Sequence, residues 1–325
     1  MFHLYWKIKP LSPERFFYAW LLNCRYDNCG VKDVTITSKS HIMKTLFSLF
    51  LAAAPFFFCT CGDTELPEPQ LSKALGTAKD QFETIMADTW ETVLDGNTFN
   101  NYTAFEEAWN YLYPWGTDHN GSARMYGSAA DHNHIYLENG VLTEKAVRIN
   151  WDEGNSSHDP WLPIRYHSGA VHAKTHVLVN DQFPNWEVKG DFQAPSVKGS
   201  WPAFWLTGVN SWPPESDILE FKGDANNWQN TFRTPTDLTS TITPVSSPGS
   251  WHNYRVWITR VNDTDVDIHY YIDGEWKAVH RGNFVGKPMY VIINLQMEGS
   301  SGGPGPTADT YFRARNIYIG RTRSY

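Results

Sequence analysis

The chain has 325 residues, of which 15% are aromatic and 19% are charged, so its composition excludes a highly charged, disordered polymer. Its formal net charge at pH 7 is −8, and because the first 61 residues are net basic, the remainder is more acidic than the whole. This balance argues against nucleic acid and anionic membranes as partners, and it weighs against a sulfated or uronate-bearing polysaccharide.

The N-terminal segment differs from the rest of the chain. Residues 1–42 show no periodicity and no domain pattern, and we expect them to be a non-native extension, with synthesis beginning at Met43. A lysine, an apolar run and small residues follow, which is the pattern of a secretory signal peptide over residues 43–61. The apolar run is too short for a membrane span. The sequence predicts a mature chain that begins near Gly62, and a genuine N-terminal anchor is the alternative.

Cysteine positions agree with this division. All cysteines precede Gly62, so the mature chain is expected to have no disulfide, no Cys-ligated zinc and no Cys nucleophile. The cysteines are Cys24, Cys29, Cys59 and Cys61. Four Asn-x-Ser/Thr sequons indicate a glycosylated secreted protein. They begin at Asn101, Asn120, Asn155 and Asn262.

The remaining sequence is typical of an all-β domain. Residues 62–89 form a polar lead-in, with a short helical pattern near Leu71–Met86. Over residues 90–325, short apolar stretches are broken by Gly, Asn, Asp and Pro about every ten residues, which favours a sandwich or barrel. Asn139-Gly140 and Asp273-Gly274 predict tight hairpin turns. Further expected strands are Tyr254–Ile258, Val266–Tyr271, Met289–Leu295 and Asn316–Ile319.

One short segment concentrates carboxylates. Residues 215–221 read Glu-Ser-Asp-Ile-Leu-Glu-Phe. Because side chains alternate across a strand, Glu215 and Asp217 share one face. Glu220 lies at an odd offset, and one β-bulge near Ile218-Leu219 would return it to that face. A solvated acidic strand is the alternative, but the apolar neighbours indicate a buried strand.

Three acids on one face predict acid–base chemistry. Repulsion between carboxylates raises the pKa of at least one of them, which creates a proton donor beside a base or nucleophile. Glycoside hydrolysis needs such a pair, and a retaining enzyme holds its two carboxyls about 5–5.5 Å apart. Strand spacing predicts the shared face but not this separation.

The same region carries a family resemblance. Residues 201–206 read Trp-Pro-Ala-Phe-Trp-Leu, and together with the Glu-x-Asp-x-x-Glu pattern they resemble glycoside hydrolase family 16. Shorter matches lie at 166–169, 251–254, 271–274 and 293–295, so the resemblance spans about residues 90–320. It implies a jelly-roll β-sandwich of two antiparallel sheets with a concave substrate cleft. It also implies Glu215 as nucleophile, Asp217 as its electrostatic and hydrogen-bonding partner, and Glu220 as general acid/base.

Three departures from the family pattern stand out. Ser216 replaces an aliphatic residue, and we expect it on the outward face. Gln296-Met297-Glu298 replaces small apolar residues, which predicts an unusual cleft wall. Arg315 stands where many members have an Asp linked to structural calcium. We therefore expect no required cofactor and regard structural calcium as doubtful.

Four tryptophans are candidate sugar-binding residues, because an indole offers a flat apolar face with a polar edge. Trp201 and Trp205 share one strand face with Ala203, where they either floor sugar subsites or pack between the sheets, and we favour the cleft for Trp205. Trp212 and Trp228 flank the acidic strand in expected loops, where they either bind sugar or anchor the loops.

Two other motifs are rejected. Gly299–Gly303 matches the Gly-x-Ser-x-Gly nucleophile elbow, but Pro304 and Pro306 prevent the helix that must follow. Asp131–His134 and Asp118-His119 could suggest a metal site, yet such pairs in polar stretches are more often surface loops.

The sequence thus predicts a secreted, extracellular, endo-acting retaining glycosidase. The expected substrate is a β-linked polysaccharide, a β-1,3- or mixed-linkage glucan, cleaved by double displacement. A transglycosylase of the same fold is one alternative. A lectin-like sugar-binding module is another, although a lectin does not need three facing acids. We expect a monomer with no nucleic acid partner and no membrane attachment after processing.

Overall fold

The computed structural model describes residues 90–324, and every structural statement below concerns this part of the chain. The predicted extension (1–42), the signal peptide (43–61) and the lead-in with its helix near Leu71–Met86 lie outside the described residues.

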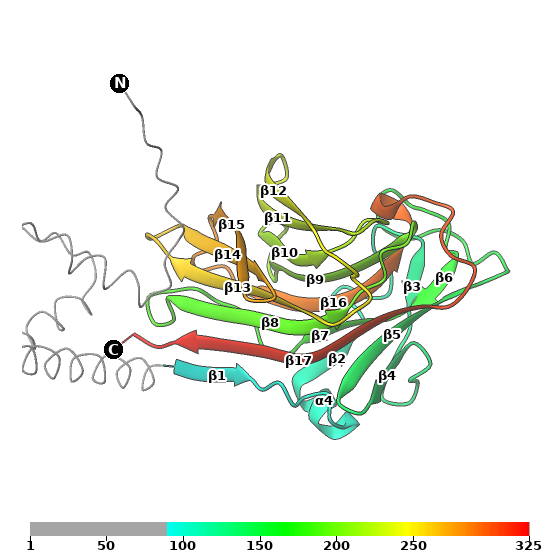
Figure 1. Cartoon of the computed structure of the whole chain (residues 1–325), viewed down its shortest axis with the longest axis horizontal. Helices are drawn as coiled ribbons and strands as arrows, with labels where there is room; N and C mark the ends of the chain where they lie inside the picture. Colours follow the sequence, from blue (N-terminus) through cyan, green and yellow to red (C-terminus); the bar gives the residue numbers. More distant parts are fainter. Residues whose placement is uncertain (1–89, 325) are drawn as a thin grey trace, which may run out of the picture. The chain divides into compact units, whose positions relative to one another are not determined.

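Two β-sheets lie face to face as two layers (Figure 1). The first runs β15 (Glu275–Gly282), β14 (Val266–Ile272), β13 (His252–Arg260), β8 (Asn185–Gln193), β17 (Thr310–Thr322), β5 (Val141–Arg148), β6 (Tyr166–Ser168) and β3 (Ala123–Met125), with β1 (Trp90–Leu94) on β17 and β4 (Ile135–Glu138) on β5. The second runs β12 (Asp237–Pro244), β11 (Asn226–Thr234), β10 (Glu215–Glu220), β9 (Ser200–Gly208), β16 (Met289–Met297), β7 (Ala170–Ala173) and β2 (Trp109–Tyr111). The chain crosses repeatedly between the layers, which confirms the predicted jelly-roll sandwich.

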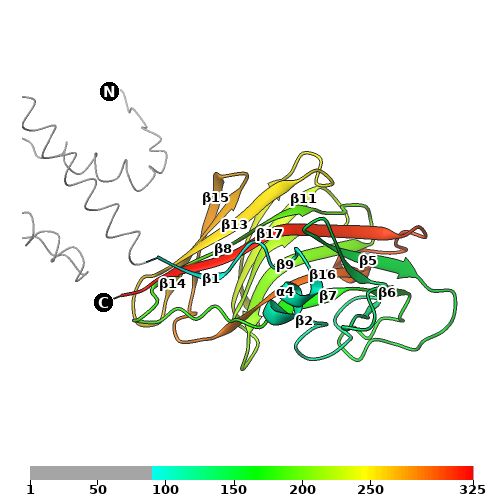
Figure 2. The same cartoon turned by 90° about the horizontal axis from the view of Figure 1, so that it is seen from below.

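Strand direction departs from the prediction at one edge. The strand pairs are antiparallel apart from β3 and β6, which run parallel with Ala123 opposite Tyr166. This pair is a local exception to the predicted antiparallel sheets. β17 has 13 residues and lies beside β8, β5 and β1 (Figure 2). Because β1 pairs with β17, the first described strand is tied to the last.

Both predicted hairpin turns are confirmed. Asn139 and Gly140 join β4 to β5 with φ of 53° and 76°. Asp273 and Gly274 join β14 to β15 with φ of 53° and 76°. A positive φ at both central residues is the requirement of a type I′ turn, which Asn-Gly and Asp-Gly meet at low steric cost.

A short helix, α4 (Tyr102–Ala108), was not predicted. Asn101 caps it, because its side-chain oxygen accepts a hydrogen bond of 2.9 Å from the amide of Ala104. Its buried residue, Phe105, lies 6.1 Å from the ring of Phe99. Seven residues with one core contact give no apolar repeat long enough to detect.

Phe192 of β8 lies among aromatic side chains that join the two sheets. Its ring centroid is 4.8 Å from Phe204 on β9, 5.4 Å from Phe312 on β17 and 6.0 Å from Tyr254 on β13. All four side chains are buried. Aromatic rings bury large apolar areas, so this cluster is a main source of cohesion between the layers.

A carboxyl group also lies inside the core. Glu144 on β5 is fully buried, and neither of its carboxyl oxygens has a hydrogen-bond partner. Burial raises the pKa of Glu144 well above its ordinary value, which favours the protonated form of the group. In the unfolded chain the same group ionises near its ordinary pKa. The free energy of unfolding therefore falls as pH rises from the ordinary pKa of glutamate to the raised pKa of Glu144 in the folded state.

We expect Glu144→Gln to be more stable than the wild type near pH 7 and similar to it near pH 4, because glutamine does not titrate. A gain of about 1 kcal/mol would raise the melting temperature by about 2–4 °C for a domain of this size. Thermal unfolding across this pH range measures it, with Glu138→Gln at the exposed end of β4 as control. An advantage that does not grow with pH would contradict a neutral buried carboxyl.

Candidate active site

β10 carries the three predicted carboxylates on one face. Its pairing with β9 shifts register between Asp217 and Leu219. The extra residue, Ile218, is the β-bulge that the sequence predicts. After the shift, Glu220 returns to the face that already holds Glu215 and Asp217.

The opposite face of β10 packs into the core. Ser216, Ile218 and Leu219 are at most 1% exposed. The expectation that Ser216 lies on the outward face is therefore wrong, because this face lies between the two sheets. Its hydroxyl oxygen lies 2.7 Å from that of Tyr270, which makes the burial of a polar group tolerable.

Glu220 is held by three donors. The indole N–H of Trp201 donates to its Oε1 at 2.7 Å, and the side-chain amide of Asn230 donates to its Oε2 at 2.8 Å. The ammonium of Lys222 lies 3.0 Å from the same Oε2. These contacts fix the carboxyl in one orientation on the cleft face.

Asn230 of β11 links two of the acids. Its Nδ2 donates to Asp217 Oδ2 at 2.8 Å as well as to Glu220. The hydroxyl of Ser240 donates to Asn230 Oδ1 at 2.7 Å, which sets the orientation of the amide. Asn230 is thus a shared donor between two like-charged groups. No sequence pattern predicts this role, because its partners lie on another strand.

The remaining carboxyl is less well supplied with donors. Trp212 donates its indole N–H to Glu215 Oε2 at 2.8 Å. Burial raises the pKa of Glu215 to about 7, although this hydrogen bond lowers it. Burial, followed by the charges of Glu215 and Glu220, raises the pKa of Asp217 well above its ordinary value. The site therefore holds protons near neutral pH, as acid–base catalysis requires.

The tryptophans of β9 lie where the sequence places them. Trp201 and Trp205 are 8% and 4% exposed and share one strand face. Trp201 contacts Glu220, and the indole N–H of Trp205 donates to Asn294 Oδ1 on β16 at 2.7 Å. A role for either ring in sugar binding stays a prediction.

The other two tryptophans differ in position. Trp212 lies in the loop before β10, as predicted, and is 51% exposed. Trp228 lies in β11, so the prediction that it lies in a loop is wrong. The ammonium of Lys222 lies 4.8 Å from the ring centroid of Trp228, a cation–π contact. The two rings flank the carboxylates from the β11 side.

A second group of aromatic side chains, not predicted, lies next to Trp205. The ring of Trp115 lies 6.1 Å from Trp205 and stacks on Tyr113 at 5.1 Å. His119 stacks on Trp205 at 5.8 Å, and burial lowers the pKa of His119 to about 4, so its ring is neutral at neutral pH. These residues come from the segment between β2 and β3, so only the fold brings them to the site.

An ion-pair network holds that segment. Arg124 donates to both carboxylate oxygens of Asp118, at 2.8 and 3.0 Å, and to Glu153 at 3.0 Å. Asp118 is 5% exposed, so the prediction of a surface loop is wrong at this residue. Among residues 90–324, no group of three or more His, Cys, Asp or Glu side chains is arranged to hold a metal ion.

A hollow of about 390 Å³ adjoins Trp201. Its lining residues are Asn120, Asp159, Pro160, Leu162, Trp201, Gly299 and Ser300. Gly299 has φ of 58°, and an added Cβ would lie 2.6 Å from the ring of Trp201, so glycine is needed for this close approach. The hollow therefore lies beside the donor to Glu220.

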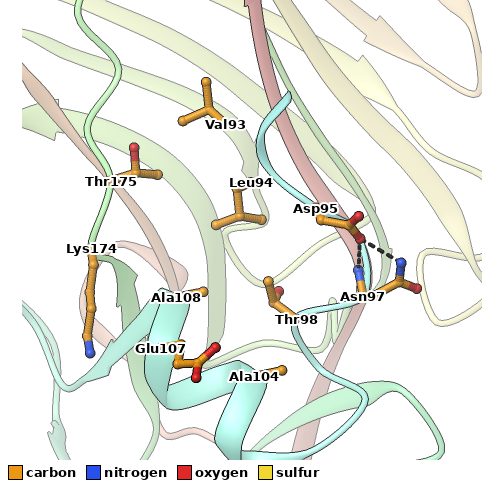
Figure 3. Close-up of a pocket in the computed structure, with 10 residues that line it drawn as sticks. All are labelled: Val93, Leu94, Asp95, Asn97, Thr98, Ala104, Glu107, Ala108, Lys174 and Thr175. Carbon is orange, nitrogen blue, oxygen red and sulfur yellow. Dashed lines mark hydrogen bonds between the residues drawn. The ribbon is translucent and has the colours of Figure 1, made fainter. Parts of the chain in front are cut away.

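Another hollow, of about 550 Å³, lies between the end of β1 and α4 (Figure 3). None of its lining residues belongs to β9, β10 or β11. Asp95 faces it, but its Oδ1 already accepts two hydrogen bonds from Asn97. The hollow shares no residue with the carboxylate site.

The rejected serine motif has a structural role. Ser301 is buried in a short 3₁₀ turn, η1 (Gly299–Ser301), and donates to the carbonyl of Glu298 at 2.7 Å. No helix follows the turn among residues 302–309. Ser301 is thus not presented as a nucleophile.

No protein-family model matches the chain. The chain is 44% identical over 233 residues to a galactan endo-β-1,3-galactanase of Flammulina velutipes, covering 71% of this chain and 90% of the relative. It is 31% identical over 190 residues to an endo-1,3-1,4-β-glycanase of Rhizobium meliloti (strain 1021), covering 55% of this chain but only 37% of that relative's length.

Solved structures show a similar fold. An endo-1,3-β-glucanase from Streptomyces sioyaensis superposes with a TM-score of 0.55 at 19% identity, covering 73% of this chain and 98% of that chain. A non-specific endo-β-1,3(4)-glucanase from family GH16 gives a TM-score of 0.54 at 17% identity, covering 72% and 92%.

The extent of the match to the Flammulina protein decides the family. The chain belongs to glycoside hydrolase family 16. The resemblance based on residues 201–206 and 215–220 is thereby confirmed, and the protein is a glycoside hydrolase.

The family 16 departures have structural explanations. Gln296 is buried on β16, where its Oε1 accepts from the amide of Ala123 at 2.8 Å. Glu298 is also buried and accepts from the hydroxyl of Ser122 at 2.8 Å. These polar residues tie the end of β16 to the segment that starts β3, and Gln296 pairs with Trp201 on the neighbouring strand β9.

The position of the family's calcium-linked aspartate does not fit a cation here. Arg315 Nε lies 3.4 Å from Asp191 Oδ2, and its guanidinium lies 4.1 Å from the ring centroid of Trp251. Asn316 donates to the same oxygen of Asp191 at 2.8 Å. The cation at position 315 and the amide of Asn316 thus both contact the carboxylate of Asp191.

We expect Asn230→Ala to lower kcat/KM by about 10²-fold, because Asp217 and Glu220 lose their shared donor and repel each other. Initial rates on a β-1,3-linked polysaccharide measure the effect. Asn226→Ala, at the start of the same strand, is the control. Ser240→Ala should give a smaller loss, since it only frees the amide to rotate. Activity of Asn230→Ala within about two-fold of the wild type would show that the bridge does not matter.

Proposed function

We propose that the protein is an endo-acting, retaining glycosidase that hydrolyses a neutral β-1,3-linked polysaccharide. The observation that carries this proposal is the arrangement of Glu215, Asp217 and Glu220 on one strand face, with Asn230 bridging two of them. The Flammulina relative is named for endo-β-1,3-galactan cleavage and the Rhizobium relative for 1,3-1,4-β-glycan cleavage. β-1,3-Galactan is therefore the first candidate substrate, and a β-1,3- or mixed-linkage glucan is the second.

The proposed reaction has two displacements. Glu215 attacks the anomeric carbon while Glu220 gives its proton to the departing glycosidic oxygen. The hydrogen-bonded Asp217 orients Glu215. Water then attacks the anomeric carbon of the glycosyl-enzyme and gives a proton to Glu220. This attack breaks the bond to Glu215, which leaves as a carboxylate. A sugar hydroxyl in place of that water would give transglycosylation by the same steps.

We also propose that the chain is secreted, acts outside the cell as a monomer and requires no cofactor. The signal-peptide pattern over residues 43–61 supports secretion. Within residues 90–324, no helix is long and apolar enough to cross a membrane. The Arg315–Asp191 contact supports a last strand that is held without calcium.

Proton NMR of the first product tests the mechanism. We expect the wild type to release the β-anomer from a β-linked polysaccharide, because two inversions retain configuration. Glu215→Ala should be inactive, and added azide should restore turnover with an inverted product, since the anion fills the space of the nucleophile. Glu220→Ala should retain activity on substrates with good leaving groups. Initial release of the α-anomer by the wild type would exclude Glu215 as the nucleophile.

The pH profile tests the state of Glu215. A nucleophile must be ionised, so kcat/KM should fall as pH drops through about 7, the value to which burial raises the pKa of Glu215. Trp212→Phe removes the indole donor that lowers this pKa, so the acidic limb should move to higher pH. Trp161→Phe, at another exposed tryptophan, is the control. An unchanged limb would mean that Trp212 does not tune the carboxyl.

A further inference from the structure

Behind the carboxylate face, three hydroxyl groups meet inside the sandwich. The hydroxyl oxygen of Tyr270, on β14 of the opposite sheet, lies 2.7 Å from Ser216 Oγ on β10 and 2.7 Å from Thr231 Oγ1 on β11. All three side chains are fully buried. A hydroxyl removed from water costs stability unless it is paired, so such a cluster is tolerated only when it is connected throughout.

The cluster reaches the site through the main chain. Tyr270 donates to the carbonyl oxygen of Asn230 at 3.1 Å. The side chain of Asn230, on the other face of β11, bridges two of the catalytic acids. Ser216 lies between Glu215 and Asp217 in the sequence. One tyrosine oxygen therefore contacts both strands that carry the acids and their shared donor.

The hydrogen bonds run in one direction. A carbonyl oxygen can only accept, so the Tyr270 hydroxyl donates its one hydrogen bond to the carbonyl oxygen of Asn230. Ser216 and Thr231 must therefore both donate to the Tyr270 oxygen. His280 Nδ1, 3.0 Å from Thr231 Oγ1, then acts as donor.

The far end of the chain of hydrogen bonds is also complete. The hydroxyl of Thr241 lies 2.9 Å from His280 Nε2 and donates to it. Burial lowers the pKa of His280 to about 4, which is consistent with a neutral ring that has one donor and one acceptor nitrogen.

A tyrosine buried in this core does not need a hydrogen-bonded hydroxyl in order to pack. Tyr254, on the neighbouring strand β13, is equally buried, and its hydroxyl has no hydrogen-bond partner. The two tyrosines differ in what their oxygens contact, which offers a matched comparison.

We propose that Tyr270, through Ser216 and Thr231, is a positioning residue that fixes β10 and β11 from behind so that the acids keep their catalytic geometry. This proposal rests on the proposed function. It assigns a catalytic consequence to the replacement of an aliphatic residue by Ser216. Tyr270 touches neither substrate nor reacting atoms, so its effect should fall on kcat rather than on binding.

Tyr270→Phe and Tyr254→Phe test the proposal on a β-1,3-linked polysaccharide well below the melting temperature. We expect kcat of Tyr270→Phe to fall by about ten-fold or more with KM within about two-fold, because displaced catalytic groups slow the reaction steeply. Tyr254→Phe should keep wild-type kcat and KM. Equal kcat values for the two variants would overturn the proposal, as would a loss explained by the unfolded fraction.

A second pair covers the case in which Tyr270→Phe does not fold. Thr231→Val keeps the shape of the side chain but removes its hydroxyl, so it should lose kcat, whereas Thr231→Ser keeps the hydroxyl and should restore it. Equal kcat for this pair would also overturn the proposal. A wild type with no activity on galactan, laminarin or mixed-linkage glucan would instead contradict the proposed function itself.

Discussion

The crowding of three carboxyl groups, two of them buried, on one short strand is the constraint on which the rest of the structure depends. Like charges held out of water repel each other, and each must find hydrogen-bond donors or keep a proton. Asn230, Trp201 and Lys222 supply donors on one side, while Glu215 has a single indole donor. This unequal supply gives chemically different environments to groups that start out alike.

Holding such a site requires support from the whole sandwich. The bulge at Ile218 directs the acids outward, while the reverse face of the strand enters the core. Aromatic packing around Phe192 joins the sheets, and the Tyr270 hydroxyl adds a polar link behind the site. Rigid packing and directional hydrogen bonds thus act together on the same two strands.

The parts that could be predicted from sequence are those set by local geometry. The bulge followed from an odd spacing of acids, and the hairpins followed from Asn-Gly and Asp-Gly at positions that need positive φ. Residues brought in from other parts of the fold, such as Asn230 on β11 and Trp115 between β2 and β3, carry no local pattern. Ser216 lies in the core rather than on the expected outward face, because a hydroxyl partner in the opposite sheet allows its burial. Trp228 lies in a strand rather than in the expected loop, because β11 begins at Asn226, shortly after the acidic strand ends.

The position of Asn120 has a practical consequence for producing the enzyme. Asn120 begins a sequon and lines the hollow beside Trp201, so an oligosaccharide attached there would lie next to the donor to Glu220. The sequon hydroxyl, on Ser122, is buried and donates to Glu298, so the folded protein hides it from a transferase. Glycosylation of Asn120 would therefore have to precede the folding of this segment. Expression hosts in which the chain folds at different rates would therefore deliver preparations that differ in the fraction of molecules glycosylated at Asn120.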